Sequence, residues 1–182
     1  MPSNIQPSLE TATLAAGCFW CTEALFRRLK GVESVMSGYT GGNKDNPSYA
    51  QVSSEKTGHA EAIQFSFDPS IIPYEKILEV FWKTHDPTTM NQQGADIGTQ
   101  YRSVIFYHSE NQHKIAEASK EQAQSMFDDP IVTEIVPFTN FFEAEADHQE
   151  FYEKNPEYGY CKLVIDPKVE KLTKNFKEDI KE

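Results

Sequence analysis

The sequence predicts an α+β fold in which helices pack on a mixed β-sheet. Residues 62–67 alternate apolar and polar side chains, which indicates a strand with one buried face. Residues 73–84 open with a proline and place Tyr74, Ile77 and Phe81 at helical spacing. Strand-like and helix-like segments are interleaved irregularly along the chain, and a mixed sheet covered by helices accommodates that order.

The first third of the chain predicts strand, helix and strand in succession. These are a strand at 11–16, a helix from about 18 to 30 and a strand at 32–39. Leu25 and Leu29 lie four apart on the inner face of the helix, and Gly31 is its expected stop. The glycines, asparagines and proline of residues 40–47 then predict a loop.

The rest of the chain continues the alternation after a long polar loop at 85–100. Loops of this length are usually functional or mobile. The elements expected after it are a strand at 103–107, a helix at 110–126, a strand at 131–136, a short helix at 143–152, an extended piece at 161–165 and a last helix at 167–180. Val169, Leu172 and Phe176 are expected to face inward from that last helix.

Length and composition narrow the class of protein. A chain of 182 residues with 38% hydrophobic residues is expected to form one domain with its own core. The net charge is -11 and no basic cluster occurs, so neither nucleic acid nor an anionic membrane is an expected partner. No apolar run approaches the roughly 20 residues of a membrane span. Residues 1–9 lack the pattern of a signal peptide, so a cytoplasmic protein is expected, with a removed leader left open.

The segment from Gly17 to Cys21 carries the strongest chemical signal. It places Cys18 at the first turn of a helix, where unpaired N–H groups and the helix dipole favour a thiolate. The thiolate is the reactive form of cysteine. Phe19 and Trp20 follow at once and offer an apolar surface. The segment therefore predicts sulfur chemistry on an apolar substrate group.

The C-x-x-C spacing of Cys18 and Cys21 allows three interpretations. A thioredoxin-like redox pair uses this spacing on a strand-to-helix turn. A zinc site would need a second such pair or two suitably spaced histidines, and the five histidines are scattered, so no metal is expected. Alternatively, both thiols are buried small hydrophobes.

Four further residues are candidates for the same chemistry. Glu61 shares a strand face with Ile63, and burial there would raise its pKa and keep a proton on it near neutral pH; a glutamate in water at the edge of the strand is the equal alternative. Tyr49 and Tyr101 lie in or beside loops, although most tyrosines serve only in packing. Cys161 lies in a turn-rich, flexible segment, where it can move to meet a sulfenic acid formed elsewhere.

Several of these motifs together resemble one family, the A-type peptide methionine sulfoxide reductases. The match covers about residues 13–174. Its motifs are Gly17-Cys18-Phe19-Trp20, Ser37-Gly38-Tyr39-Thr40-Gly41-Gly42, Gly58-His59-Ala60-Glu61, His85-Asp86-Pro87-Thr88, Gly98-Thr99-Gln100-Tyr101-Arg102-Ser103, Glu143-Ala144-Glu145 with His148-Gln149, and Gly159-Tyr160-Cys161.

The resemblance implies reduction of the S epimer of methionine sulfoxide, free or in proteins, on a ferredoxin-like α+β sandwich. The resemblance implies that Cys18 is the nucleophile and that Glu61 protonates the sulfoxide oxygen, to which Tyr49 and Tyr101 donate hydrogen bonds. It also implies that Phe19 and Trp20 hold the methyl group of the substrate and that Asp96 and His148 line or support the site. Cys161 would be the recycling cysteine.

The resemblance also implies a reaction cycle and an organisation. A thioredoxin-type dithiol would reduce the resulting disulfide, without metal or organic cofactor. We expect one catalytic domain over 1–182, with its core at about 11–165 and a C-terminal segment at 155–182, acting as a monomer.

One departure and two rival functions remain open. Many relatives carry glycine where this chain has Cys21, which could condense with oxidised Cys18, accept a disulfide from Cys161, or stay idle. Cys161 is favoured as the resolving thiol because its segment can bend. The rivals are a thioredoxin-like disulfide oxidoreductase and a redox-sensing binding protein that docks through Phe19 and Trp20.

Overall fold

The computed structural model describes residues 8–182 of the chain. The polar N-terminal stretch on which the expectation of no signal peptide rests lies mostly outside these residues. Within residues 8–182, none of the helices combines the length and the apolar character that crossing a bilayer requires.

One six-stranded sheet forms the centre of the fold, with strand order β7-β6-β1-β3-β2-β8. The strands are β1 (Glu10–Ala16), β2 (Val32–Thr40), β3 (Ala60–Phe67), β6 (Ser103–Tyr107), β7 (Glu134–Pro137) and β8 (Phe141–Glu143). Neighbouring strands are antiparallel except β6 and β7, which are parallel. The expectation of a mixed sheet is confirmed.

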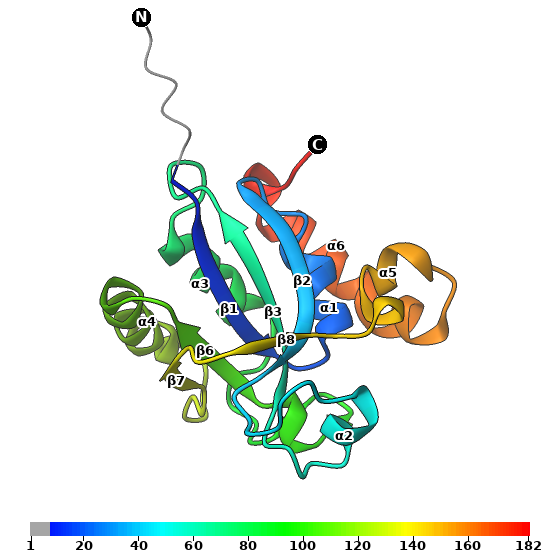
Figure 1. Ribbon diagram of the computed structural model, residues 1–182. Coiled ribbons are helices and arrows are strands. Elements are labelled where there is room, and N and C mark those ends of the chain that lie inside the picture. Colours follow the sequence, from blue (N-terminus) through cyan, green and yellow to red (C-terminus); the bar gives the residue numbers. More distant parts are fainter. Residues whose placement is uncertain (1–7) are drawn as a thin grey trace, which may run out of the picture.

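The four inner strands and two helices form a ferredoxin-like core. Helix α1 (Phe19–Phe26) connects β1 to β2, and α3 (Tyr74–Thr84) follows β3 on the way to β6. In each case the two strands run parallel with one antiparallel strand between them, which makes two interlocking β-α-β units. Figure 1 shows α1 and α3 behind the sheet.

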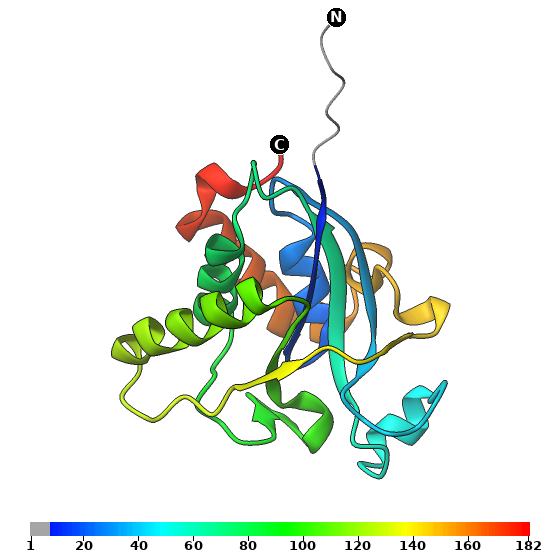
Figure 2. The same cartoon turned by 60° about the vertical axis from the view of Figure 1, so that its left-hand side comes forward.

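The two faces of the sheet are covered differently. On the helix side, Leu14, Ile63 and Phe65 join the main core cluster, as the alternation in residues 62–67 predicts. On the other side the small side chains of Ala15 and Ala62 leave room for the chain that leads from β7 to β8 (Figure 2). This face of the sheet is therefore covered by the extended segment between β7 and β8 rather than by a helix.

The remaining helices lie around this core. Helices α4 (Glu110–Ala123), α5 (Phe151–Lys154) and α6 (Asp166–Asn175) follow the main strands, and α2 (Tyr49–Ser53) precedes β3. The sequence did not predict α2. Its N-cap is Ser48, whose side chain accepts from the Gln51 N–H while the Gln51 side chain accepts from the Ser48 N–H, and this capping box begins a helix in the predicted loop.

The long polar loop at 85–100 contains a short hairpin of β4 (Gln92–Gln93) and β5 (Asp96–Ile97). The Asp86 N–H donates to Gln93 Oε1 (2.9 Å), and the Gln93 side chain packs where a Cβ on Gly17 would stand. These contacts bring β5 to the N-terminal end of α1.

Helix α1 ends at Phe26, four residues before its expected end. The C-terminal residues hydrogen-bond to the chain just beyond it: Leu29 bridges to Ile180, the Lys181 N–H donates to Arg28 O (2.8 Å), and Lys181 Nζ donates to Arg27 O (2.9 Å). Because these partners satisfy the backbone there, the helix need not continue.

Three expectations for the C-terminal third are wrong. The segment expected as a helix at 143–152 begins with the end of β8 and contains a 3₁₀ turn and a left-handed residue, Glu150 (φ 53°), before α5. Cys161–Ile165 is a π-helical turn rather than an extended piece, and it runs directly into α6. Helix α6 ends at Asn175 rather than at 180.

Candidate active site

A tight turn places Cys18 at the N-cap of α1. Gly17 has φ +90°, and a Cβ there would lie 2.7 Å from the Gln93 side chain, so only glycine fits. Cys18 has an extended backbone (ψ 124°), and its carbonyl accepts from the Cys21 N–H (3.1 Å). The thiol of Cys18 therefore lies over the first turn of α1, as the sequence predicts.

Burial gives Cys18 a pKa opposite to the sequence-based expectation. The residue is only 9% exposed, and removal from water raises the pKa of its thiol, helped by the neighbouring Cys21 and by the nearby Glu61 carboxyl. A hydrogen bond involving the Trp20 backbone acts in the opposite direction but does not overcome burial. In the resting site Cys18 is therefore a thiol and not a thiolate.

Cys21 occupies the third position of α1 and shows the opposite behaviour. A hydrogen bond from Cys18 lowers the pKa of Cys21 to about 7, against the effect of burial. Lys168 acts in the same direction through its charge, and the Tyr160 hydroxyl through a hydrogen bond. Within this pair the negative charge therefore belongs to Cys21.

Glu61 faces α1 from β3 and is 1% exposed. Its Oε1 accepts from the Phe19 N–H (3.2 Å), whereas its Oε2 is buried and has no hydrogen-bond partner among the described residues. Burial raises the pKa of Glu61 to about 8, and the single hydrogen bond from Phe19 reverses only part of this effect. The carboxyl therefore holds its proton at neutral pH, as expected from its strand face.

Two phenols complete the surroundings of Glu61. Tyr49 begins α2, and Tyr101 ends a 3₁₀ turn at Thr99–Tyr101. Burial raises the pKa of both phenols, and the Glu61 carboxyl is the next contributor in each case. Both residues are therefore neutral hydrogen-bond donors close to Glu61.

Asp96 on β5 lies on the Cys21 side of the site. Its Oδ2 accepts from the Tyr160 hydroxyl (2.7 Å), and the same hydroxyl contacts Cys21 Sγ (3.5 Å). The tyrosine therefore links the β4–β5 hairpin to the C-terminal segment across α1. The sequence marks Tyr160 only as the neighbour of Cys161 in the glycine-tyrosine-cysteine motif.

Trp20 and His148 form the opposite wall. Trp20 Nε1–H donates to His148 Nδ1 (3.1 Å), and Phe151 stacks on Trp20 with ring centroids 3.7 Å apart. Tyr49 lies against His148 at 4.5 Å between centroids. Phe19, in contrast, is 1% exposed and packs in the main core, so only Trp20 of the two aromatics is partly open to solvent.

Cys161 is fully buried and lies in one cluster with Cys18 and Cys21. Burial raises the pKa of its thiol, and the charge on Cys21 adds to this effect. The π-helical turn that carries Cys161 packs against α1 through Ile165, so the thiol lies in the core rather than in an exposed turn.

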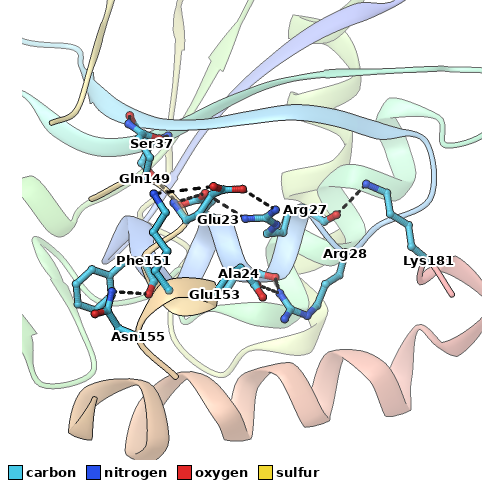
Figure 3. A network of polar contacts seen from close by, with 12 residues as sticks. Glu23, Ala24, Arg27, Arg28, Ser37, Gln149, Phe151, Glu153, Asn155 and Lys181 are labelled. Carbon is cyan, nitrogen blue, oxygen red and sulfur yellow. Dashed lines mark hydrogen bonds and ion pairs between the residues drawn. The ribbon is translucent and has the colours of Figure 1, made fainter. Parts of the chain in front are cut away.

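Glu23 is a buried residue of α1 that the sequence analysis missed (Figure 3). The Glu150 N–H donates to both of its carboxyl oxygens (2.9 and 3.1 Å), and the Ser37 hydroxyl donates to Oε2 (3.1 Å). Arg27 lies 3.7 Å away. Gln149, next in the chain, pairs with the Ser37 backbone (2.9 and 2.7 Å). The sequence feature that could have identified Glu23 is that it is the only acidic residue in a helix whose other residues are mostly apolar.

His85 and His59, which belong to two of the sequence motifs, lie outside the site and bond to neighbouring segments. Burial lowers the pKa of His85 to about 4, and its ring bonds to Phe81 O and Ser103 Oγ. His59 accepts from the Gly42 N–H (3.0 Å) and so fixes the loop before α2. In the part of the chain that the structure covers, no group of three or more His, Cys, Asp or Glu side chains gathers around a metal-sized position.

The arrangement brings the ten predicted site residues into one region. It combines a thiol, a protonated carboxyl, two phenols and an aromatic wall. Such a set can attack a centre whose neighbouring oxygen takes up a proton.

Known proteins share this fold and sequence. A family model described as peptide methionine sulfoxide reductase matches residues 10–180. A peptide methionine sulfoxide reductase MsrA from Sulfolobus acidocaldarius is 56% identical over 168 residues, covering 92% of this chain and 96% of that protein. Reduced Mxr1 from Saccharomyces cerevisiae superposes with a TM-score of 0.78 at 38% identity, covering 87% of this chain and 94% of that one. Mxr1 in complex with Trx2 matches with a TM-score of 0.56 at 27% identity, covering 82% and 91%.

Proposed function

The chain belongs to the peptide methionine sulfoxide reductase family, and on that premise we propose that it reduces the S epimer of methionine sulfoxide, free or in proteins, with Cys18 as the nucleophile. Family membership makes the protein an oxidoreductase acting on methionine sulfoxide. The observation that carries the mechanism is the pairing of Cys18 with Glu61, a carboxyl of pKa about 8 with one unpartnered buried oxygen.

Glu61 serves as the acid for the sulfoxide oxygen. A sulfoxide sulfur becomes electrophilic when its oxygen accepts a proton, and a carboxyl with a pKa near 8 keeps that proton at physiological pH. Tyr49 and Tyr101 provide two further hydrogen-bond donors to the oxygen as charge develops on it. The unpartnered Oε2 of Glu61 supports this role, since a bound sulfoxide would supply its missing partner.

Cys18 attacks the sulfur as a thiol that loses its proton during the reaction. Because burial favours the neutral forms of both Cys18 and Glu61, the empty site carries neither charge. Glu61 gives its proton to the oxygen, and the proton that leaves Cys18 restores Glu61. The net change moves the oxygen from the methionine sulfur to Cys18 Sγ, which oxidises the cysteine to a sulfenic acid and reduces the substrate to methionine.

Trp20 holds the methyl group of the substrate, while Asp96 and His148 border the entrance. Trp20 is fixed by its hydrogen bond to His148 and by the stack on Phe151. Burying one methyl group contributes about 0.8 kcal/mol. Because this free energy is small, the methyl contact orients the sulfoxide but adds little to its affinity. Phe19 supports the site from the core, where its ring lies against that of His148 (5.4 Å between centroids).

An intramolecular disulfide then returns the enzyme to its reduced form. Cys161 and Cys21 are the two thiols that can resolve the sulfenic acid, and both lie in the cluster that contains Cys18. A thioredoxin-type dithiol reduces the disulfide by exchange. The structure of the similar protein Mxr1 with Trx2 supports this type of reductant.

Methionine formation from separate S and R sulfoxides tests the proposal. With dithiothreitol as reductant, the wild-type protein should convert the S epimer and leave the R epimer, and Cys18→Ser should convert neither. A Cys18→Ser protein that retains full turnover would exclude Cys18 as the nucleophile. Reduction of insulin disulfides without any methionine formation would instead support the thioredoxin-like rival.

A further inference from the structure

A partly exposed carboxylate at the edge of the site has no assigned part in the proposed reaction. Glu145 lies between the end of β8 and a 3₁₀ turn at Ala146–His148. Its side chain is 43% exposed, yet both of its oxygens accept hydrogen bonds from other parts of the chain. The two donors lie 106 and 96 residues away in sequence, so their bonds hold Glu145 between distant segments.

The first oxygen of Glu145 is bound to the core of the sheet. Its Oε1 accepts from the hydroxyl of Tyr39 on β2 (3.1 Å). The Tyr39 ring is fully buried and packs against Phe19, with 5.7 Å between centroids. Burial raises the pKa of Tyr39, and the charge of Glu145 adds to this effect, so the phenol remains the donor. This bond therefore fixes the carboxylate relative to β2.

The second oxygen of Glu145 is bound to the first residue of α2. Its Oε2 accepts from the Tyr49 N–H (3.1 Å). The capping box at the start of this helix satisfies the N–H groups of Ser48 and Gln51, and it leaves that of Tyr49 to another acceptor. Glu145 is that acceptor, and it connects α2 to β2 through one side chain.

Glu145 also lies beside the aromatic wall of the site. The Tyr49 ring packs on His148 with 4.5 Å between centroids, and His148 Nδ1 accepts from the Trp20 indole (3.1 Å). Because an indole N–H only donates, the proton of His148 belongs on Nε2, which lies 4.0 Å from Glu145 Oε2. The backbone of Tyr49 and the ring on which it packs are thus both next to the same carboxylate.

The position of the Tyr49 phenol depends on such contacts. Helix α2 has five residues, and so short a helix has little stability of its own in water. A donor stabilises charge on an oxygen only when it is held at hydrogen-bond distance from the place where that charge develops. A displacement of about 1 Å can remove much of the benefit.

We propose that Glu145 is a positioning residue, which holds Tyr49 through the two hydrogen bonds so that the phenol donates to the sulfoxide oxygen. This inference rests on the role proposed above for Tyr49. Glu145 acts through Tyr49 and does not itself touch the substrate.

A double-mutant cycle on the first turnover tests the proposal. Methionine formation from S-methionine sulfoxide is measured by rapid quench without reductant in wild type, Glu145→Ala, Tyr49→Phe and the double variant. Tyr49→Phe loses one donor and should slow by roughly 10²-fold. Glu145→Ala misplaces that donor and should slow by about tenfold, with the half-saturating sulfoxide concentration within about threefold of wild type. The double variant should stay within about threefold of Tyr49→Phe, because no phenol is left to position.

Two conservative variants separate this role from a general effect on folding or charge. Glu145→Gln keeps an oxygen that can accept from the Tyr49 N–H, so its rate should lie within about threefold of wild type. Asp147→Asn removes the charge of an exposed neighbouring carboxylate and should match wild type. Circular dichroism checks that each variant is folded.

Three results would overturn the proposal. The first is a Glu145→Ala protein as fast as wild type. The second is a double variant slower than Tyr49→Phe by the same factor by which Glu145→Ala slows wild type, since Glu145 would then act independently of Tyr49. The third is an unchanged rate in Tyr49→Phe, which would leave no donor to position. If wild type forms no methionine, the proposed function itself fails, and this role fails with it.

Discussion

Of two buried glutamates, Glu23 belongs to α1 and Glu61 faces this helix from β3, and their surroundings are opposite. Glu23 receives three hydrogen bonds, from Glu150 and Ser37, and an ion pair with Arg27. Glu61 receives one hydrogen bond, from Phe19, and its second oxygen has no partner within the described chain. Burial raises the pKa of both carboxyls, but in Glu23 the hydrogen bonds and Arg27 oppose the effect more completely.

The difference shows that burial alone does not make a carboxyl reactive. A fully paired carboxylate such as Glu23 holds two segments together and has no free lone pair for a substrate. A half-paired carboxyl such as Glu61 keeps its proton and leaves one oxygen free for a ligand. The first arrangement stabilises the wall that carries His148 and Phe151, and the second suits the acid role that we propose for Glu61.

The largest expected effect is on the rate of the Glu61→Gln variant. The amide cannot donate a proton as an acid, so methionine formation in a single turnover should slow by roughly 10²–10⁴-fold. Rapid-quench measurement without reductant records this step. Glu23→Gln, a matched change on the other glutamate, should stay within about threefold of wild type in properly folded protein. Equal rates in the two variants would show that Glu61 has no role in the reaction that Glu23 lacks.

The second effect concerns folding stability, for which the change at Glu23 should matter more than the change at Glu61. Glu23→Ala leaves the Glu150 N–H and the Ser37 hydroxyl without their partner in a buried place, so the free energy of unfolding should fall by about 2–4 kcal/mol. Urea denaturation followed by circular dichroism measures the loss. Glu61→Gln should cost less than Glu23→Ala in the same experiment. A Glu23→Ala protein as stable as wild type would show that this network contributes nothing.

The pH dependence of stability should separate the two carboxyls further. The folded-state pKa of Glu61 is about 8, above the usual value of 4.5 for an unfolded chain, so between these values the folded state binds more protons. The contribution of Glu61 is therefore fully present below about pH 4.5 and is lost as the pH rises through about 8. Glu61→Gln lacks this loss, so its stability relative to wild type should increase from pH 5 to pH 8. A constant difference across that range would contradict the raised pKa.

The smallest effect is expected from Ser37→Ala. It removes one neutral donor from Glu23 and leaves the Glu150 N–H in place, so unfolding should become easier by about 1 kcal/mol. The same denaturation curves report it, with the exposed Ser54→Ala as a control for loss of a hydroxyl. A loss as large as that of Glu23→Ala would mean that Ser37, and not Glu150, is the main partner.

Local patterns in the sequence predicted much of the fold and several parts of the site. The alternation around Ile63 gave the strand that buries Glu61, and Gly17 followed by Cys18 gave the start of α1. These features depend on neighbours in the chain. The predicted lowering of the Cys18 pKa was wrong. The sequence indicates the helix N-terminus, which favours a thiolate, but it does not indicate that Cys18 is buried beside Glu61, which raises the pKa.

What the sequence could not give depends on contacts between distant segments. Strand β8 pairs with the free edge of β2, from which it is separated by about 100 residues of chain. The π-helical turn at Cys161–Ile165 lies where Ile165 packs in the same cluster as Cys21. Glu23 has its partners 14 and 127 residues away. No local periodicity records such pairs.

The chain from Glu150 to Lys181 is fastened to α1 at both ends, by Glu23 near the middle of the helix and by the carbonyls of Arg27 and Arg28 beyond it. A tether secured at two points can bow outward at its centre, but it cannot drift away. Cys161 lies between these two attachment points, so a movement that exposed its thiol would leave both ends of the segment bound to α1 and the chain beyond it.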